Sequence, residues 1–293
     1  MRKTLLLLAL VTILSCNRDK NSSDIKVFNI GIKNSDSESL IEINKQGNTI
    51  KERFPTPQGY DWVEEQPDSF GYFIENFKLK PYGSPILKYD GNPIATQHLH
   101  EAVFDIDTGN KDLQQCADAV IRLRAEYWYK AKRFDDIKFH FTNGDLVTWN
   151  DYKNGVRAFV NGNSVTFRKA ADADDSYQSF RNYLDLIFNY AGTISLNQET
   201  KPVTKNSNLK TGNILITPGS PGHVVLITGV CKNKDGKRLF LLAEGFTPAQ
   251  SIHLISNPFD QHISPWYDLD VDAPEVKTAR YLFNPPNFRS FDN

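Results

Sequence analysis

The sequence predicts an α+β fold in which a long helix packs against an antiparallel sheet that carries additional hairpins. Apolar side chains recur at spacings of three and four between about residues 112 and 131, which is the period of an amphipathic helix. Hairpin signals occur around Asn143-Gly144, Asn161-Gly162 and Asn233-Lys-Asp-Gly236. The arms of the third hairpin are His223–Cys231 and Arg238–Glu244. Together these patterns place the helix before the main sheet.

The chain begins with the features of a bacterial lipoprotein signal. Arg2 and Lys3 precede an apolar run of about ten residues, which is too short to span a bilayer. Cys16 directly follows Leu-Ser, and a cysteine there resembles the lipid-bearing residue of bacterial lipoproteins. We expect residues 1–16 to be a signal peptide with a lipobox and Cys16 to anchor the protein to a bacterial membrane. The expected location is the cell envelope, at the outer membrane facing the periplasm or at the cell surface. The alternative is an ordinary secretory signal.

The rest of the chain predicts one folded unit behind a short tether. Residues 17–24 are polar, and residues 25–293 are expected to form a single α+β domain, with 25–60 as a candidate N-terminal extension. The net charge of −1 and the lack of a basic stripe argue against binding nucleic acid. Besides Cys16 only Cys116 and Cys231 are present, too few for a disulfide scaffold, although these two could form one bridge.

Local patterns place the remaining elements in chain order. Alternation predicts strands, periodicity of three to four predicts helices, and Pro-rich or aromatic-rich composition predicts ordered coil. The expected elements are one or two strands in Ile25–Ile50, a helix over Asp68–Phe77 capped by Asp68, a strand over His98–Asp107, a helix over Asp175–Tyr190, a short buried strand over Gly212–Ile216, and an ordered cover over one face from Asn257 onward.

Cys116 is the candidate nucleophile. It lies on the apolar stripe of the long helix, and a free cysteine that faces inward can simply pack in the core. A cap at Asp112 would place Cys116 in about the second turn, where the positive end of the helix dipole favours a thiolate. Gln114 and Gln115 can supply amide donors of the kind that an oxyanion hole needs. The sequence leaves the packing and the nucleophilic interpretations open.

His223 and Glu244 are the candidate base and its orienting partner. His223 follows Pro221-Gly222, so we expect its imidazole at the rim of the sheet, where a base can meet a reacting group. An even-length loop in the following hairpin puts His223 and Glu244 on one face. Pairing of Cys231 with Arg238 would make them diagonal neighbours roughly 7 Å apart. The alternative for Glu244 is a surface carboxylate at the end of a strand.

Two further polar groups favour a structural interpretation. Arg122 lies four residues after Asp118 and four before Glu126, a ladder typical of a solvated helix face, with contact to a substrate as the alternative. His98 and His100 would point to the same side of a strand, but two ligands do not make a metal site. We therefore predict no metal and no cofactor.

Four segments resemble a bacterial family of envelope lipoproteins known as domain of unknown function number 4846, and the resemblance covers roughly Phe54 to Phe291. The family name carries no activity. The four segments are Asp112-Leu-Gln-Gln-Cys-Ala-Asp-Ala-Val-Ile-Arg-Leu-Arg-Ala-Glu-Tyr127, Tyr190-Ala-Gly-Thr-Ile-Ser-Leu196, Gly219-Ser-Pro-Gly-His223 and Leu242-Ala-Glu-Gly-Phe-Thr-Pro-Ala-Gln250.

More loosely, the strand pair Gly212–Ile216 and His223–Ile227 is similar to the NlpC/P60 and CHAP amidases. A thiol at a helix start followed by a strand-borne histidine is also the chain order of papain-like cysteine hydrolases. The resemblance implies a papain-like core, with Cys116 as nucleophile, His223 as general base and Glu244 as orienting residue. The interval between Cys116 and His223 is longer than in those amidases.

These residues predict hydrolysis of an amide or ester bond. His223 would take the thiol proton, Cys116 would attack the carbonyl, and backbone amides with Gln115 would hold the oxyanion before water releases the acyl group. Envelope location and the amidase analogy make cell-wall peptide the expected substrate class. The alternative is a non-catalytic lipid-anchored protein that holds a glycan, peptide or protein partner in a hydrolase-like cleft or near Trp266-Tyr267.

Overall fold

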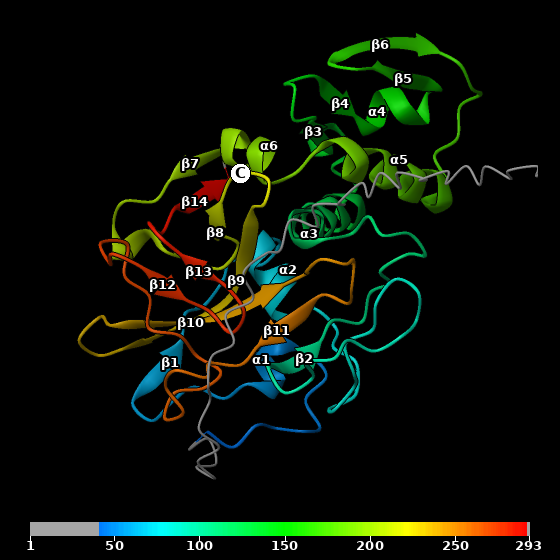
Figure 1. The fold of residues 1–293 in the computed structure, drawn as a ribbon. Coiled ribbons are helices and arrows are strands. Elements are labelled where there is room, and N and C mark those ends of the chain that lie inside the picture. The colour runs from blue at the N-terminus through cyan, green and yellow to red at the C-terminus, as the bar shows by residue number, and fades with distance from the viewer. Residues whose placement is uncertain (1–40, 292–293) are drawn as a thin grey trace, which may run out of the picture.

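The computed structural model describes residues 41–291, and these form a mixed fold of helices and antiparallel sheets (Figure 1). The expected signal peptide, the expected lipidation site Cys16, the expected tether and the strands expected in residues 25–40 lie outside the described residues. Within residues 41–50 no strand is present, and a short helix begins at Ile50 instead. None of the helices in the described part has both the length and the apolar character needed to cross a membrane.

The main sheet has eight strands, seven of which follow the order β2-β11-β10-β9-β8-β14-β7, while β1 pairs with the far end of β9. Its central strands are buried almost throughout, which explains their continuous apolar sequence. The strands are β1 (Tyr60–Trp62), β2 (His100–Val103), β7 (Thr200–Pro202), β8 (Ile214–Thr217), β9 (His223–Asn233), β10 (Arg238–Glu244), β11 (His253–Ile255) and β14 (Phe288–Phe291). The predicted hairpin of His223–Cys231 and Arg238–Glu244 is confirmed.

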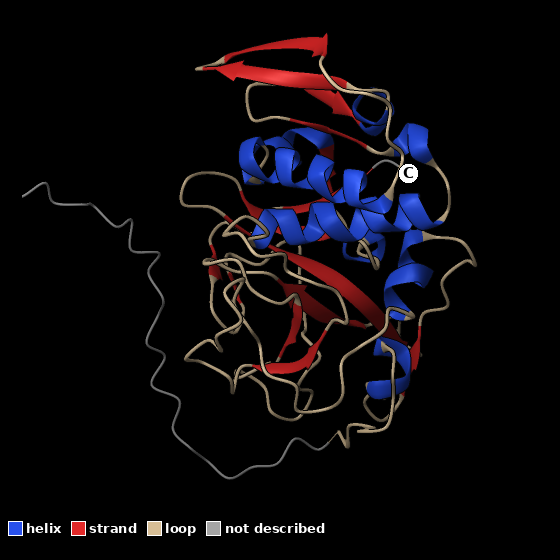
Figure 2. Cartoon of the chain, turned by 90° about the vertical axis from the view of Figure 1, so that its right-hand side faces the viewer, coloured by secondary structure: helices blue, strands red, loops and turns tan. Residues whose placement is uncertain are grey.

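The long helix α3 (Cys116–Lys130) packs against this sheet through an apolar cluster that includes Val120, Leu226 and Ala243 (Figure 2). The predicted start at Asp112 is wrong, because Gln115 is the N-cap and its backbone N–H donates to the Asp118 carboxylate at 3.1 Å. Asp112 serves another purpose, since its carboxylate accepts from the backbone of Ala249 at 2.7 Å. That bond ties the segment before the helix to the segment after β10.

Two hairpins and two helices follow α3 in the chain, and they lie beyond α3 as seen from the sheet (Figure 1). Both hairpins form around the predicted Asn-Gly pairs. Aromatic rings hold this part together, including Tyr129 stacked on Phe180 with centroids 4.3 Å apart. Its elements are the 3₁₀ turn η1 (Phe134–Asp136), β3 (Lys138–His140), β4 (Leu146–Thr148), α4 (Trp149–Lys153), β5 (Val156–Asn161), β6 (Ser164–Lys169) and α5 (Tyr177–Tyr190).

The other helices are short. The helix predicted over Asp68–Phe77 is α2 (Phe70–Glu75), and its cap is Ser69, whose hydroxyl accepts from Tyr72 N–H at 3.0 Å. The predicted cap Asp68 has a positive φ of 67°, which is not the extended backbone of an N-cap. The remaining short elements are α1 (Ile50–Arg53), α6 (Thr193–Glu199) and the 3₁₀ turn η2 (Asn206–Asn208).

The C-terminal segment is partly the ordered cover that was predicted and partly a member of the sheet. β12 (Val276–Lys277) and β13 (Leu282–Phe283) pair with each other and pack on the face of β9 that carries Val225. The last strand, β14, lies between β8 and β7 in the main sheet. This insertion was not predicted, because a four-residue strand carries little periodicity of its own.

Candidate functional site

A β-bulge brings His223 and Glu244 to one face of the sheet. At the turn, Cys231 pairs with Leu239 and not with Arg238, so the predicted even-length loop is wrong. The register then shifts between Leu241 and Leu242, and beyond the bulge Leu242 faces Ile227. A Cys231–Arg238 pair would give that same register, so past the bulge His223 and Glu244 are the diagonal neighbours that were predicted.

The imidazole of His223 is bonded to the carboxylate of Glu244 inside the protein. Its Nε2 lies 2.7 Å from Glu244 Oε2, and the two residues are only 3% and 2% exposed. The surface alternative for Glu244 is therefore wrong, and His223 is more deeply enclosed than a position at the sheet rim would suggest. Burial makes this contact strong, because little water competes for it.

The Cys116 thiol completes the contact chain. Cys116 is the first residue of α3 and is 9% exposed, and its side chain is close enough to the His223 imidazole to help raise the pKa of that imidazole. Because Nε2 of the ring is engaged by Glu244, Nδ1 is the nitrogen left for the thiol. The structure thus places the thiol nearer to the helix start than the predicted second turn. At this position the backbone N–H of Cys116 is among the helix donors without an intrahelical acceptor.

Two glycines allow the segments around the site to approach closely. A Cβ at Gly245, directly after Glu244, would lie 2.8 Å from the Gln115 carbonyl oxygen and 2.9 Å from the Ala119 Cβ. A Cβ at Gly222, directly before His223, would lie 2.4 Å from the Thr193 hydroxyl oxygen. The start of α3 and the turn before β9 therefore fit against the sheet only because these positions lack side chains.

Arg280 holds the other oxygen of Glu244. Its Nε donates to Glu244 Oε1 at 2.8 Å, and its Nη2 donates to His253 Nε2 at 2.8 Å. His253 is suited to accept this bond, because its Nδ1 donates to the Ser251 carbonyl at 2.8 Å and burial lowers its pKa. Burial alone would raise the pKa of Glu244, but Arg280 and His223 hold that pKa well below its ordinary value. Glu244 is therefore a buried carboxylate with a cation on one oxygen and an imidazole on the other.

The imidazole of His223 is set up to carry a proton. Burial opposes its charged form, yet the hydrogen bonds with Cys116 and Glu244 outweigh burial and raise the pKa of His223 to about 9. Rings pack around the imidazole, with centroids at 4.7 Å for Tyr281 and 5.0 Å for Phe246. The ring is thereby fixed between thiol and carboxylate, and a protonated imidazole beside a thiol favours the thiolate.

Gln115, the predicted oxyanion donor, is held beside the thiol. Its Nε2 donates to Asp112 Oδ1 and its Oε1 accepts from the Thr247 hydroxyl, both at 3.1 Å. One of the two amide N–H groups of Gln115 is not used in these bonds. Gln115 is half-buried and Thr247 is exposed, so the thiol lies next to solvent-facing groups.

Cys231 is remote from this site. It lies eight residues along β9 from His223, roughly 26 Å at the rise of a strand. Burial raises the pKa of its thiol to about 12. Both Cys116 and Cys231 are free thiols, so the disulfide considered from the sequence is not formed.

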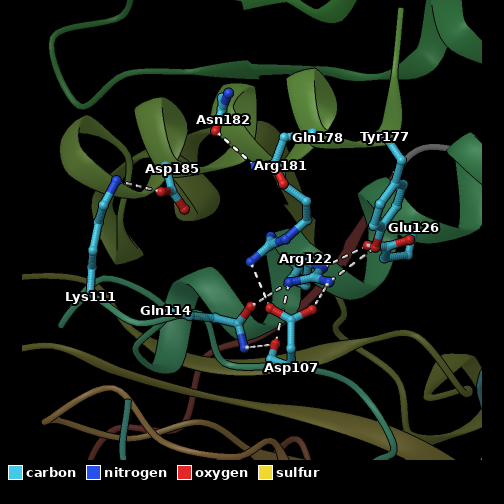
Figure 3. A network of polar contacts seen from close by, with 10 residues as sticks. All are labelled: Asp107, Lys111, Gln114, Arg122, Glu126, Tyr177, Gln178, Arg181, Asn182 and Asp185. Atoms are coloured by element: carbon cyan, nitrogen blue, oxygen red, sulfur yellow. Dashed lines mark hydrogen bonds and ion pairs between the residues drawn. The ribbon is translucent and has the colours of Figure 1, made fainter. Parts of the chain in front are cut away.

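The predicted surface ladder on α3 is wrong. Arg122 is fully buried, and its Nε donates to Glu126 at 2.7 Å while its Nη2 donates to Asp107 at 2.9 Å (Figure 3). Asp118 does not pair with Arg122, because it accepts from the start of its own helix. Periodicity could not show this, because α5 covers the face of α3 that a lone helix would expose.

The other sequence candidates do not form a metal site. The two ring nitrogens of His100 lie 2.7 Å from the Gln97 carbonyl oxygen and 3.0 Å from that of Ser84. No group of three His, Cys, Asp or Glu side chains in residues 41–291 is arranged to hold a metal ion.

Sequence reasoning missed Arg280, His253 and Tyr281. No local pattern distinguishes Arg280, which lies far along the chain from the residues that it contacts. Glu244 was predicted because it ends β10, and the strand that pairs with β10 begins at His223.

Comparison with known proteins gives a family and no function. Residues 50–290 match the family model described as "Domain of unknown function (4846)". Searches of curated proteins and of solved structures each found no significant match.

Proposed function

Since the chain belongs to the family of domain of unknown function 4846, whose description states no activity, we propose a function from the site itself. The proposed function is hydrolysis of an amide or ester bond by a cysteine nucleophile. The observation that carries it is the buried contact chain from the Cys116 thiol through His223 to Glu244. A nucleophile, a base and an orienting carboxylate in contact are the parts that covalent catalysis by cysteine requires.

The proposed reaction begins with the proton on the imidazole. His223 holds the proton that leaves the thiol, Glu244 stabilises the imidazolium, and Cys116 attacks the carbonyl carbon. The imidazolium then returns the proton to the departing amine or alcohol. Water attacks the resulting thioester with His223 as base, which releases the acid and restores the thiol.

The start of α3 supports the oxyanion. The carbonyl oxygen becomes negative during the attack, and the free backbone N–H groups at the helix start carry the positive end of the helix dipole. The amide N–H of Gln115 that is not used in its bond with Asp112 is a further donor on the residue next to Cys116. These groups are fixed before the reaction, which is what makes such stabilisation effective.

The wider proposal is a papain-like core in a lipid-anchored envelope protein, with cell-wall peptide as the substrate class. It is supported by the lipoprotein-like signal ending at Cys16 and by the resemblance of the two strands before and at His223 to the NlpC/P60 and CHAP amidases. The antiparallel sheet packed by a helix that starts with the cysteine is consistent with it.

Alkylation of the thiols tests the proposed nucleophile. A fluorescent iodoacetamide is reacted with the folded protein at neutral pH, and the labelled cysteine is identified by mass spectrometry. We expect fast labelling at Cys116 that slows in His223→Ala and is absent in Cys116→Ala. Cys231 is the internal control, because its buried thiol should stay unlabelled in all three proteins.

A second candidate function is favoured by the enclosure of the site. Cys116 is 9% exposed and His223 is 3% exposed, which suits a core that is no longer catalytic. The protein would then be a lipid-anchored binding protein for a glycan, peptide or protein partner. Equally slow labelling of Cys116 in the wild type and in His223→Ala would support this candidate against the hydrolase.

A further inference from the structure

A large groove lies along the C-terminal half of α3, away from Cys116. It is formed by α2, α3, the segment after β2 and the start of α5, and its volume is about 940 Å³. Volumes of about 300–1,000 Å³ are typical of sites that take organic ligands. Arg122 already lies roughly 9 Å along the helix axis from Cys116 at the rise of an α-helix, and the rest of the groove lies farther. The groove is therefore distinct from the thiol site.

Aromatic rings line opposite sides of this groove. Tyr72 on α2 and Tyr177 on α5 both line the groove, and each is 46% exposed. Phe73 also lines the groove and contacts the ring of Tyr127 with centroids 5.6 Å apart. The rings thus offer flat apolar faces to a ligand.

The floor of the groove is polar, and its charges are paired with one another. Arg122 donates to Asp107 and Glu126, and Tyr177 donates its hydroxyl to Glu126 at 2.7 Å (Figure 3). Arg181 donates to the other oxygen of Asp107 at 3.1 Å. In Figure 3 these side chains converge from α3, α5 and the segment after β2. The floor is therefore a rigid, internally neutralised surface that still presents carboxylate oxygens, since Asp107 is 60% exposed at its side chain.

We infer that this groove binds a neutral oligosaccharide. Sugar rings have apolar C–H faces that pack on exposed aromatic rings, and hydroxyl edges that bond with carboxylates and amides. The exposed Tyr72 and Tyr177 supply the first kind of contact, and Asp107 with Asn76 supplies the second. The ions of the floor, Arg122, Asp107, Glu126 and Arg181, already satisfy one another, which favours a ligand that is neutral where it meets the floor. Lys130 and Asp68 also line the groove but lie outside this set of paired ions.

Isothermal titration calorimetry on the full chain tests the inference. Chitotetraose, cellotetraose and maltotetraose are titrated separately, with a cell-wall tetrapeptide as a fourth ligand. We expect at least one oligosaccharide to bind, and Tyr72→Ala and Tyr177→Ala to weaken it about tenfold, the size expected when one good aromatic contact is lost. Tyr82→Ala is the matched control, because Tyr82 is 43% exposed but does not line the groove.

The outcomes separate this inference from the proposed hydrolase. Cys116→Ala should bind the oligosaccharide as tightly as the wild type, whatever its activity. Absence of binding to all three oligosaccharides, or equal weakening by Tyr82→Ala, would overturn the inference. Binding of the tetrapeptide alone, with dependence on Tyr72, would assign the groove to peptides and also overturn it.

Discussion

The substitution Glu244→Gln tests whether the Glu244 carboxylate stabilises the proton on His223. Glutamine has the shape of glutamate and an oxygen that can still accept, but it removes the buried negative charge. Arg280, whose side chain is 9% exposed, then loses its carboxylate partner. Breaking a buried ion pair by neutralising one side costs roughly 3–5 kcal/mol, and we expect about 3 kcal/mol because the amide oxygen retains one hydrogen bond.

The same substitution removes the negative charge that stabilises the His223 imidazolium. Cys116 and Glu244 together raise the pKa of His223 from 6.5 to about 9 against the effect of burial. Glu244 raises this pKa through both its hydrogen bond and its negative charge, so the loss of the carboxylate lowers the pKa of His223. Because the imidazolium beside Cys116 is then less stable, alkylation of Cys116 at pH ~7 should slow about tenfold.

The assay is the second-order rate of alkylation, with the fold checked by near-ultraviolet circular dichroism and the stability measured by urea unfolding. Glu199→Gln is the matched control, because Glu199 also pairs with a histidine, His140, at 2.8 Å in another part of the protein. An unchanged rate in Glu244→Gln, or the same loss in Glu199→Gln, would refute the reasoning.

Three further predictions concern the same site. First, the raised pKa of His223 stabilises the folded protein fully below its unfolded pKa of 6.5, and this stabilisation is lost as pH rises through about 9. The difference in unfolding free energy between wild type and His223→Gln, measured by urea titrations, should therefore shrink by about 3 kcal/mol over that window. A constant difference would contradict the raised pKa. Second, Gly245→Ala should cost about 1–3 kcal/mol and slow alkylation, because its methyl group pushes the start of α3 from β10. Gly192→Ala, with no atom near its Cβ, is the control, and equal losses in both would count against a specific contact. Third, Arg280→Met should cost about 3–5 kcal/mol in unfolding experiments, because it removes the cation from one oxygen of the buried Glu244 carboxylate. A smaller loss in Arg280→Lys would show the role of charge, whereas a neutral Arg280→Met would refute the pairing.

The sequence predicted the candidate catalytic residues that lie at the ends of helices and strands. Cys116 begins a helix, His223 begins a strand and Glu244 ends one, and periodicity locates such ends within a few residues. The hairpin of β9 and β10 was therefore predictable, whereas the shared face of His223 and Glu244 depends on the bulge between Leu241 and Leu242, which was not predicted. The Asn-Gly hairpins were predictable for the same reason, because their turn chemistry is local.

The parts that were not predictable depend on contacts between distant segments. Asp112 is a residue type that often caps helices, but its carboxylate accepts a hydrogen bond from the backbone N–H of Ala249. The ladder of Arg122 looks solvated on an isolated helix, yet Tyr177 and Asp107 cover it. Arg280 contacts Glu244 from 36 residues away along the chain, and no spacing rule reaches so far.

The central claim is that Cys116, His223 and Glu244 act as one proton-sharing unit. An NMR titration of the His223 imidazole, in the wild type and in Cys116→Ala, tests it most directly. The raised pKa predicts that the imidazole of the wild type titrates near pH 9 and that the loss of the thiol moves this titration to lower pH. Titration near 6.5 in both proteins, the ordinary value of histidine, would contradict the claim.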